Sequence, residues 1–267
     1  MTNKSGAILG AHQKIDRVAY KYLKAEVDLK DNFPSIKDIL HFEGKNGPDG
    51  IKRKSPAKDE PEHFYDPFDE EDTQLLELMR KHYIDFVNHL KKGETERVAF
   101  EAAWIAHAVV DGLTPAHHFP YEQRLAEIRG GDKESRTSVK DKLIMPGTNI
   151  REMMKSNWAM WGVGGLMSSH GLYEVGIAAA VAGLKFPTSK PSEGDFQLLV
   201  DIGFEEYFKR TARQVAMMDL YDRFLQHGWQ RKLIRDIRNE LMPTMIKSVI
   251  LVWYSALREA GLLKGKK

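Results

Sequence analysis

Histidine and acidic residues four positions apart recur along this chain of 267 residues. In a helix, side chains at that spacing project from the same face, one turn apart. An imidazole and a carboxylate placed in this way suit a divalent metal ion such as zinc. The pairs are His12/Asp16, His107/Asp111, His118/Glu122 and His170/Glu174. The spacing predicts metal chemistry, and the competing interpretation of any single pair is an ordinary hydrogen-bonded or solvated pair.

The pair His107/Asp111 differs from the others because its surroundings are apolar. Residues 98–110 leave scarcely a polar face, which is typical of a helix in the middle of a bundle. An ionised aspartate in that position costs several kcal/mol unless a partner compensates its charge. This pair is therefore the strongest candidate for a ligand pair.

Composition limits the chemistry further. Cysteine is absent while ten histidines are present, so a metal must be held by His, Asp and Glu. The formal net charge of +2 is far from the basic balance expected of a protein that binds duplex nucleic acid. Ferritin-like sites need paired Glu-x-x-His motifs, and the match at Glu60 to His63 contains a proline. The His-Asp dipeptide of HD-type phosphohydrolases does not occur.

The elements that must position these residues are helices, because apolar residues follow a helical period almost throughout. One set is Ile15, Val18, Ala19, Tyr22 and Leu23, and a second is Leu75, Met79, Tyr83, Phe86, Val87 and Leu90. Further helices are expected at about 150–160, 167–183, 195–227 and 239–260, and no run has the pattern of a strand. We expect a single all-α domain over residues 1–267.

Two polar segments rich in helix breakers separate these helices. Residues 44–58 contain Gly47-Pro48-Asp49-Gly50, and residues 119–147 contain Gly130-Gly131. Both are predicted to be loops. Because loops of this length in a compact domain are usually functional, we expect the first to wall a site and the second to be an insertion or lid beside it.

The remaining histidines and the aromatic residues receive plainer interpretations. His82 is expected in the core, His89 and His227 at helix surfaces or ends, and His41 as a stray ligand at most. Trp158 and Trp161, with Met153, Met154, Met160 and Met167, are expected to pack in the core, the alternative being a wall of an acyl-chain or base-stacking cleft.

No membrane-spanning or secretory segment is expected. The first 12 residues lack the apolar core that a secretory signal needs, so either the protein stays inside the cell or a signal is missing from this sequence. The longest apolar run, residues 249–254, is too short to cross a bilayer. We expect a soluble protein, cytoplasmic on this evidence alone.

The motifs, taken in order, resemble the bacterial zinc-dependent phospholipases C. They are His12, Asp49, His63 in His63-Phe-Tyr-Asp-Pro67, His107-Ala-Val-Val-Asp111 followed by His117, and His170-Gly-Leu-Tyr-Glu174. That family is secreted, has an all-α bundle with a trinuclear zinc site, hydrolyses phosphodiesters and is related to the fungal single-strand-specific nucleases. A glutamate at position 174, where the nucleases have aspartate, favours the phospholipase branch.

The resemblance also implies a role for each ligand. One zinc would be held by Asp49, His63, His107 and Asp111, a second by His117, His170 and Glu174, and a third by His12 with a bridging Asp111. The family completes the third position with an amino-terminal tryptophan, whereas the first tryptophan here is Trp104, so two or three ions are expected. Gly50 and Glu60 stand where the family has the aromatic residues of its choline pocket. His118 competes with His117 as a ligand.

The expected activity is hydrolysis of phospholipids by a metal-bound hydroxide, with Asp49 as the general base or as the residue that positions the water. Contact with a membrane surface would then be transient. A nuclease or nucleotidase on the same scaffold is the first alternative, and the second is a non-catalytic helical binding protein stabilised by metal.

Overall fold

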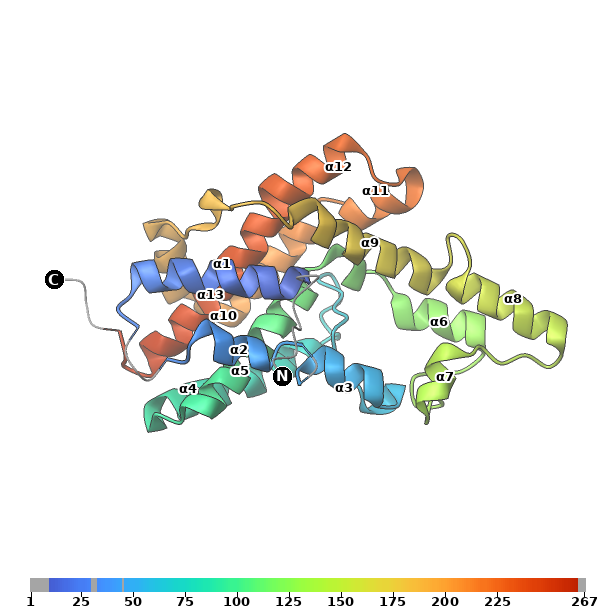
Figure 1. Cartoon of the computed structure of the whole chain (residues 1–267), viewed down its shortest axis with the longest axis horizontal. Coiled ribbons are helices and arrows are strands. Elements are labelled where there is room, and N and C mark those ends of the chain that lie inside the picture. Colours follow the sequence, from blue (N-terminus) through green and yellow to red (C-terminus); the bar gives the residue numbers. More distant parts are fainter. Residues whose placement is uncertain (1–9, 30–32, 45, 264–267) are drawn as a thin grey trace, which may run out of the picture.

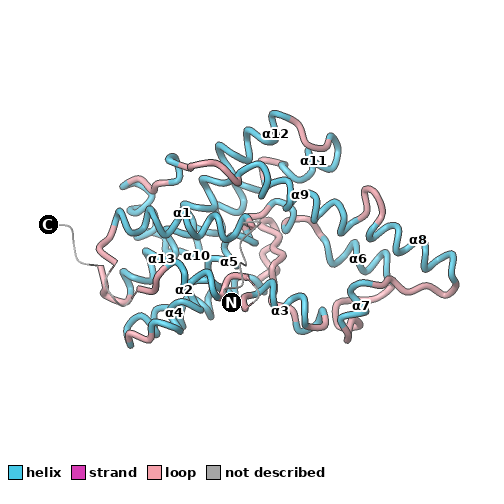
Figure 2. The backbone as a smooth tube through the Cα atoms, in the orientation of Figure 1, coloured by secondary structure: helices cyan, strands magenta, loops and turns pink. Residues whose placement is uncertain are grey.

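The computed structural model describes residues 10–29, 33–44 and 46–263. Residues 1–9, which include most of the segment examined for a secretory signal, lie outside the described residues. The described part of the chain consists of helices and connecting turns, with no strand in it (Figure 2). The prediction of an all-α fold is confirmed.

The helices follow the chain in a simple order. They are α1 Ala11–Glu26, α2 Ile36–His41, α3 Pro48–Lys54, α4 Gln74–Lys92, α5 Thr95–Gly112, α6 Tyr121–Arg129, α7 Val139–Leu143, α8 Ile150–Trp161, α9 Leu166–Val181, α10 Glu193–Ala216, α11 Leu220–His227, α12 Arg231–Asp236 and α13 Met242–Glu259. Short turns of tighter helix are η1 Ala57–Asp59, η2 Pro115–His117 and η3 Pro187–Ser189, and η4 Ile237–Leu241 is a π-helix.

Helix α5 forms the centre of the bundle, as its apolar sequence predicts. It is buried on all sides and packs against α1, α2, α4 and α13 (Figure 1). Trp253 of α13 donates its indole N–H to the carbonyl of Ala102 at 3.0 Å, inside the core. At the end of α5, a Cβ on Gly112 would lie 2.5 Å from Phe208, so only glycine lets that ring close over the helix end beside Asp111.

Helices α6, α7 and α8 form an arm that extends from the bundle, at the right of Figure 1. The arm has a small core of its own, made by Tyr121, Leu125, Met145 and Met160. The prediction of a loop over residues 119–147 is therefore wrong, because this segment contains α6 and α7. A capping box of Ser138 and Asp141 starts α7, and this signal outweighs the breakers around it.

The prediction of a loop over residues 44–58 is also wrong in its central part. Residues 48–54 form α3, with Pro48 in its first turn. Proline is favoured there because its missing N–H would have no partner inside the helix. Asp49 consequently lies in the first turn of a helix rather than in a loop.

The predicted helices 195–227 and 239–260 differ in detail from the observed ones. The first is divided after α10, and Asp219 before α11 has a left-handed φ of 51°. The second begins earlier, since α12 runs through the π-helix η4 directly into α13. The π-helix ends two residues before Pro243, which cannot donate a hydrogen bond to the preceding turn.

The tryptophans of α8 are the clearest departure from the expected core. Trp158, Met154, Trp161 and Met153 are 67%, 66%, 40% and 38% exposed, so core packing is wrong for all four, whereas Met160 is buried as expected. None of the described helices combines the length and apolar character that a membrane crossing would need.

Candidate metal centre

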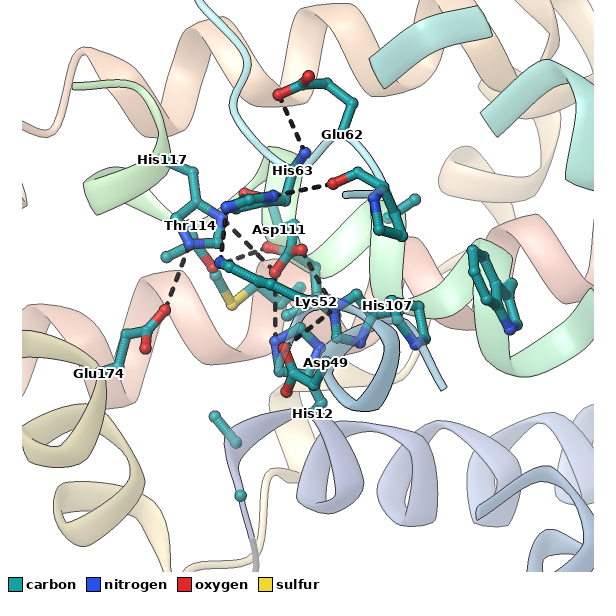
Figure 3. Close-up of a pocket in the computed structure, with 18 of the residues that line it drawn as sticks. His12, Asp49, Lys52, Glu62, His63, His107, Asp111, Thr114, His117 and Glu174 are labelled. Carbon is teal, nitrogen blue, oxygen red and sulfur yellow. Dashed lines mark hydrogen bonds and ion pairs between the residues drawn. The ribbon is translucent and has the colours of Figure 1, made fainter. Parts of the chain in front are cut away.

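Asp111, in the last turn of α5, has three histidine side chains around its carboxylate (Figure 3). Its Oδ1 lies 3.3 Å from Nε2 of His12 and 3.5 Å from Nδ1 of His117. Its Oδ2 lies 3.2 Å from Nε2 of His107. These histidines come from α1, η2 and α5, so the packing of separate elements brings them to one carboxylate.

A second group of side chains lies on the other side of His117. Oε1 of Glu174 lies 3.2 Å from Nε2 of His117 and 3.1 Å from Nε2 of His170. The rings of His117 and His170 stack with their centroids 5.1 Å apart. His170 and Glu174 are one turn apart on α9, and α9 thereby brings an imidazole and a carboxylate to the same point. His117 connects the two groups.

Three of the histidines are oriented by hydrogen bonds from Nδ1. The acceptors are the carbonyl of Pro61 for His63 at 3.1 Å, the carbonyl of Asp111 for His117 at 3.1 Å, and the carboxylate of Glu43 for His107 at 2.9 Å. A ring nitrogen that donates to an oxygen carries the proton, so Nε2 of the same neutral ring carries the lone pair. This is the arrangement that orients metal-binding histidines.

Lys52 places an ammonium group inside this cluster. The side chain projects from α3, and its Nζ lies 2.6 Å from Nε2 of His63 (Figure 3). The same helix carries Asp49, whose Oδ1 lies 3.9 Å from Nε2 of His107. The Asp49 side chain is 62% exposed. Asp111, the other carboxylate predicted to hold the same zinc ion, is buried. Helix α3 thus presents the carboxylate of Asp49 and the ammonium group of Lys52 to the centre.

The charges of the cluster shift its pKa values in opposite directions. Burial lowers the pKa of His63 well below its usual range, and the Lys52 ammonium lowers it further. Burial also lowers the pKa of His170. Burial alone would raise the pKa of Asp111, but the charges of His107 and His117 hold it well below its usual range. Burial alone would lower the pKa of His107, but the carboxylates of Asp111 and Glu43 raise it well above its usual range. Asp111 is therefore ionised, His63 and His170 favour the neutral form that binds metal, and a metal ion would have to displace a proton from His107.

Glu43 is a member of the site that the sequence did not reveal. It is 2% exposed, and its Oε1 lies 2.9 Å from Nδ1 of His107 and 3.6 Å from Nδ1 of His12. These two rings stack with centroids 4.1 Å apart, so one carboxylate faces both of them from the side opposite Asp111. No motif contains Glu43, and its burial became apparent only in the fold.

Asp16 is buried close to the same region. It is 1% exposed, and its Oδ2 has no hydrogen-bond partner among the described residues. Burial and the charge of Glu43 raise its pKa well above its usual range. The interpretation of His12/Asp16 as a solvated pair is therefore wrong, because Asp16 points into the protein.

The remaining histidines lie apart from the cluster. His118 turns away and donates from Nε2 to the carbonyl of Gly112 at 2.9 Å, so it is His117 that faces the centre. His82 is in the core with Nδ1 2.6 Å from Glu101, as expected. His41 is exposed and pairs with Asn46, and the structure does not bring it to the other ligands. His227 ends α11 on the surface, as expected.

The residues present fit a divalent metal ion. His117, His170 and Glu174 place their ligand atoms within 4.8 Å of one another, and so do His12, Glu43 and His107. In the second of these groups Glu43 faces Nδ1 of both rings, so it orients them while their Nε2 atoms face Asp111. Nε2 of His117 faces a carboxylate oxygen while its Nδ1 already donates to a carbonyl. A lone pair and a carboxylate repel unless a cation or a proton lies between them. Nδ1 of His12 and Oε2 of Glu43 are buried without a hydrogen-bond partner in the described structure.

Two cavities open onto the cluster. The smaller, of about 280 Å³, is lined by His12, Asp49, His107 and Asp111. The larger, of about 780 Å³, extends from His63, His170 and Glu174 to the arm. Its apolar lining consists of Phe64, Tyr121, Leu125, Val139, Leu143, Met160, Trp161 and Met167, and the arm also contributes the charged side chains of Glu122, Arg136 and Lys142. Asp49, Lys52, His63 and Glu174 line both cavities.

Comparison of the chain with protein-family models, with curated proteins and with solved structures gave no match in any of the three.

Proposed function

We propose that the protein is a zinc-dependent phosphodiesterase that hydrolyses phospholipids in the manner of a phospholipase C. The observation that carries this proposal is the set of imidazole Nε2 atoms directed at Asp111 and Glu174, with Nδ1 of His63, His107 and His117 held by oxygen acceptors. A structural role alone does not require this orientation, whereas metal binding does.

The residues that would hold zinc are those predicted from the motifs. Asp49, His63, His107 and Asp111 form one set, His117, His170 and Glu174 a second, and His12 with Asp111 a third. Zinc bound there would polarise the phosphoryl oxygens and acidify a water molecule.

Asp49 and Lys52 are the side chains proposed to act on the substrate. Asp49 is exposed in both cavities and would accept a proton from the attacking water at a carboxylate oxygen. Lys52 would donate a hydrogen bond from its ammonium group to a phosphate oxygen. The water oxygen forms a bond to phosphorus while the bond between phosphorus and the glycerol oxygen breaks. The leaving oxygen takes a proton from solvent water, which gives diacylglycerol and a phosphorylated head group.

The larger cavity favours a lipid as the substrate. A phosphodiester beside His63 and Glu174 would place its apolar part against the wall formed by Leu125, Met160 and Met167. Burial of an acyl chain there would contribute about 0.8 kcal/mol for each methylene removed from water.

A nuclease on the same scaffold is favoured by one observation. The rings of Phe64 and Tyr121 stack with centroids 4.9 Å apart in the cavity wall, and an aromatic surface of this kind also accepts a nucleobase. The two functions differ in substrate while sharing the centre.

The test is a side-by-side assay of the zinc-loaded protein on phospholipid vesicles and on single-stranded DNA, together with its metal content. We expect diacylglycerol from the vesicles, loss of activity on chelation and recovery on addition of zinc. Cleavage of DNA alone would establish the nuclease. Bound zinc without hydrolysis of any phosphodiester would leave a metal-stabilised binding protein, and absence of bound zinc would overturn the metal centre itself.

A further inference from the structure

Helix α8 carries an apolar face on the outside of the arm. The face consists of Ile150, Met154, Trp158 and Trp161, which are 73%, 66%, 67% and 40% exposed. Their spacing of four, four and three residues places them in one stripe along the helix. These large apolar side chains thus lie together on one surface, and such a contiguous patch marks an interaction site more often than scattered residues do.

A neighbouring side of α8 is fixed to the rest of the arm. Met160 is 1% exposed and belongs to the small core. The Asn157 side chain accepts a hydrogen bond from the backbone N–H of Met145 at 3.1 Å and donates one to its carbonyl at 2.9 Å. These contacts fix α8 on the arm in an orientation that leaves the apolar face exposed.

The apolar surface continues onto the neighbouring segments. Trp161 donates its indole N–H to the carbonyl of Leu143 at 2.9 Å, which joins the end of α7 to the end of α8. Leu143 and Ile144 are 55% and 45% exposed, and Val163, after α8, is 93% exposed. Figure 1 shows α8 at the end of the molecule farthest from the bundle.

Basic residues border the face. Arg151 and Lys155 are exposed and follow Ile150 and Met154 directly in the sequence. The nearby carboxylate of Glu152 accepts hydrogen bonds from the backbone N–H and the hydroxyl of Thr148. An apolar face with tryptophan, flanked by Arg and Lys, is the composition of helices that lie in the interface of a bilayer. The basic side chains meet anionic head groups while their stems stay at the apolar boundary.

The face also leads to the candidate centre. Leu143, Met160 and Trp161 line the cavity of about 780 Å³ that reaches His63 and Glu174. A lipid that leaves the bilayer at α8 would enter this cavity without crossing the bundle. The choice of a bilayer over a protein partner follows from this continuity and from the charge at the border.

We propose that the α8 face, with Leu143, Ile144 and Val163 beside it, docks on the surface of an anionic lipid bilayer. The proposal rests on the phospholipid substrate proposed above for the continuity of the cavity, and on exposure and charge for the contact itself.

The test is flotation of the full-length zinc-loaded protein with phosphatidylcholine vesicles that contain or lack phosphatidylserine. We expect binding to anionic vesicles that weakens as salt is raised. The double variant Met154→Ser/Trp158→Ser should bind these vesicles at least about tenfold more weakly, because it lacks the two apolar side chains that insert into the bilayer. A matched control is Ile84→Ser/Met217→Ser, which removes two apolar side chains exposed elsewhere, 52% and 64% respectively, and should bind like the unmodified protein.

Several outcomes would overturn docking. They are absence of vesicle binding by the unmodified protein, equal binding by the two double variants, and self-association in solution that the Met154→Ser/Trp158→Ser variant abolishes without any vesicle binding. An assay of hydrolysis of a soluble phosphodiester distinguishes failure of the docking proposal from failure of the proposed function. Vesicle binding without hydrolysis of any phosphodiester supports docking and contradicts the proposed function, whereas hydrolysis without vesicle binding does the reverse.

Discussion

The carboxylate of Glu43 accepts a hydrogen bond from Nδ1 of His107 at 2.9 Å, although the two residues are 64 positions apart in the chain. This bond directs Nε2 of His107 at Asp111, 3.2 Å away. A carboxylate behind a histidine, with the ligand atom in front, fixes the ring and makes it a better metal ligand. Glu43 is thus a positioning residue for the candidate centre.

Glu43→Ala should lower zinc affinity by roughly 10- to 100-fold, and Glu43→Gln, which keeps an acceptor, should lower it less. The measurement is competition with a chromogenic chelator. Glu101→Ala provides a matched control, because Glu101 is also a buried glutamate bonded to a histidine, His82, outside the cluster. Glu101→Ala should lower the melting temperature while leaving zinc affinity unchanged. Equal affinities for all variants would remove Glu43 from the centre.

Asp49→Asn should reduce turnover by roughly 100-fold or more while most of the metal stays bound. The reason is that Asp49 is 62% exposed at the rim, whereas the buried Asp111 contacts three histidines. Asp111→Asn should therefore lose metal as well as activity. Metal content and turnover are measured on the same samples, and loss of all metal from Asp49→Asn would contradict the assignment as general base.

His117→Ala and His118→Ala should have different effects although the residues are adjacent. His117 faces Asp111 and Glu174, so its loss should reduce the number of zinc ions bound. His118 donates to the carbonyl of Gly112, so its loss should lower stability without a change in metal content. Elemental analysis and thermal unfolding distinguish the two, and the reverse pattern would exchange their roles.

Lys52→Met should weaken inhibition by inorganic phosphate about tenfold, because the ammonium group beside His63 would no longer bind a phosphate oxygen. Zinc affinity should rise or stay constant, since a positive charge is removed from the cluster. Lys54→Met on the same helix is the control, because Lys54 lines neither cavity, and it should leave phosphate inhibition unchanged. Unchanged inhibition in Lys52→Met would exclude the proposed contact.

The stability of the metal-free protein should fall on acidification partly because of His118. Burial lowers the pKa of His118 to about 4, below the ordinary value of 6.5. Between these values the unfolded chain binds a proton that the folded chain does not, so stability is lost as pH falls from about 6.5 to about 4. The loss is at most about 3 kcal/mol. Denaturant unfolding of His118→Asn across this range should show a shallower pH dependence than the unmodified protein, and parallel curves would contradict the assignment.

Local sequence was sufficient for the elements with a strong apolar period. Helix α5 was predicted from residues 98–110 and is buried along its length, because a helix without a polar face can only lie inside. Breaker residues were a weaker guide. Pro48 and Gly130 suggested long loops, yet proline suits a first helical turn and glycine a helix end, so α3 and α6 form next to them.

The sequence by itself determined the helical class, the pairing of His107 with Asp111 and of His170 with Glu174, and the restriction of any metal site to histidine and carboxylate ligands, since these follow from residue type and a fixed helical period. Only the tertiary structure decided that Glu43 and Lys52 join them, that His117 rather than His118 faces the centre, and that α8 turns its tryptophans outward. The physical reason is that each of these depends on the packing of elements distant in the chain, which no local period encodes.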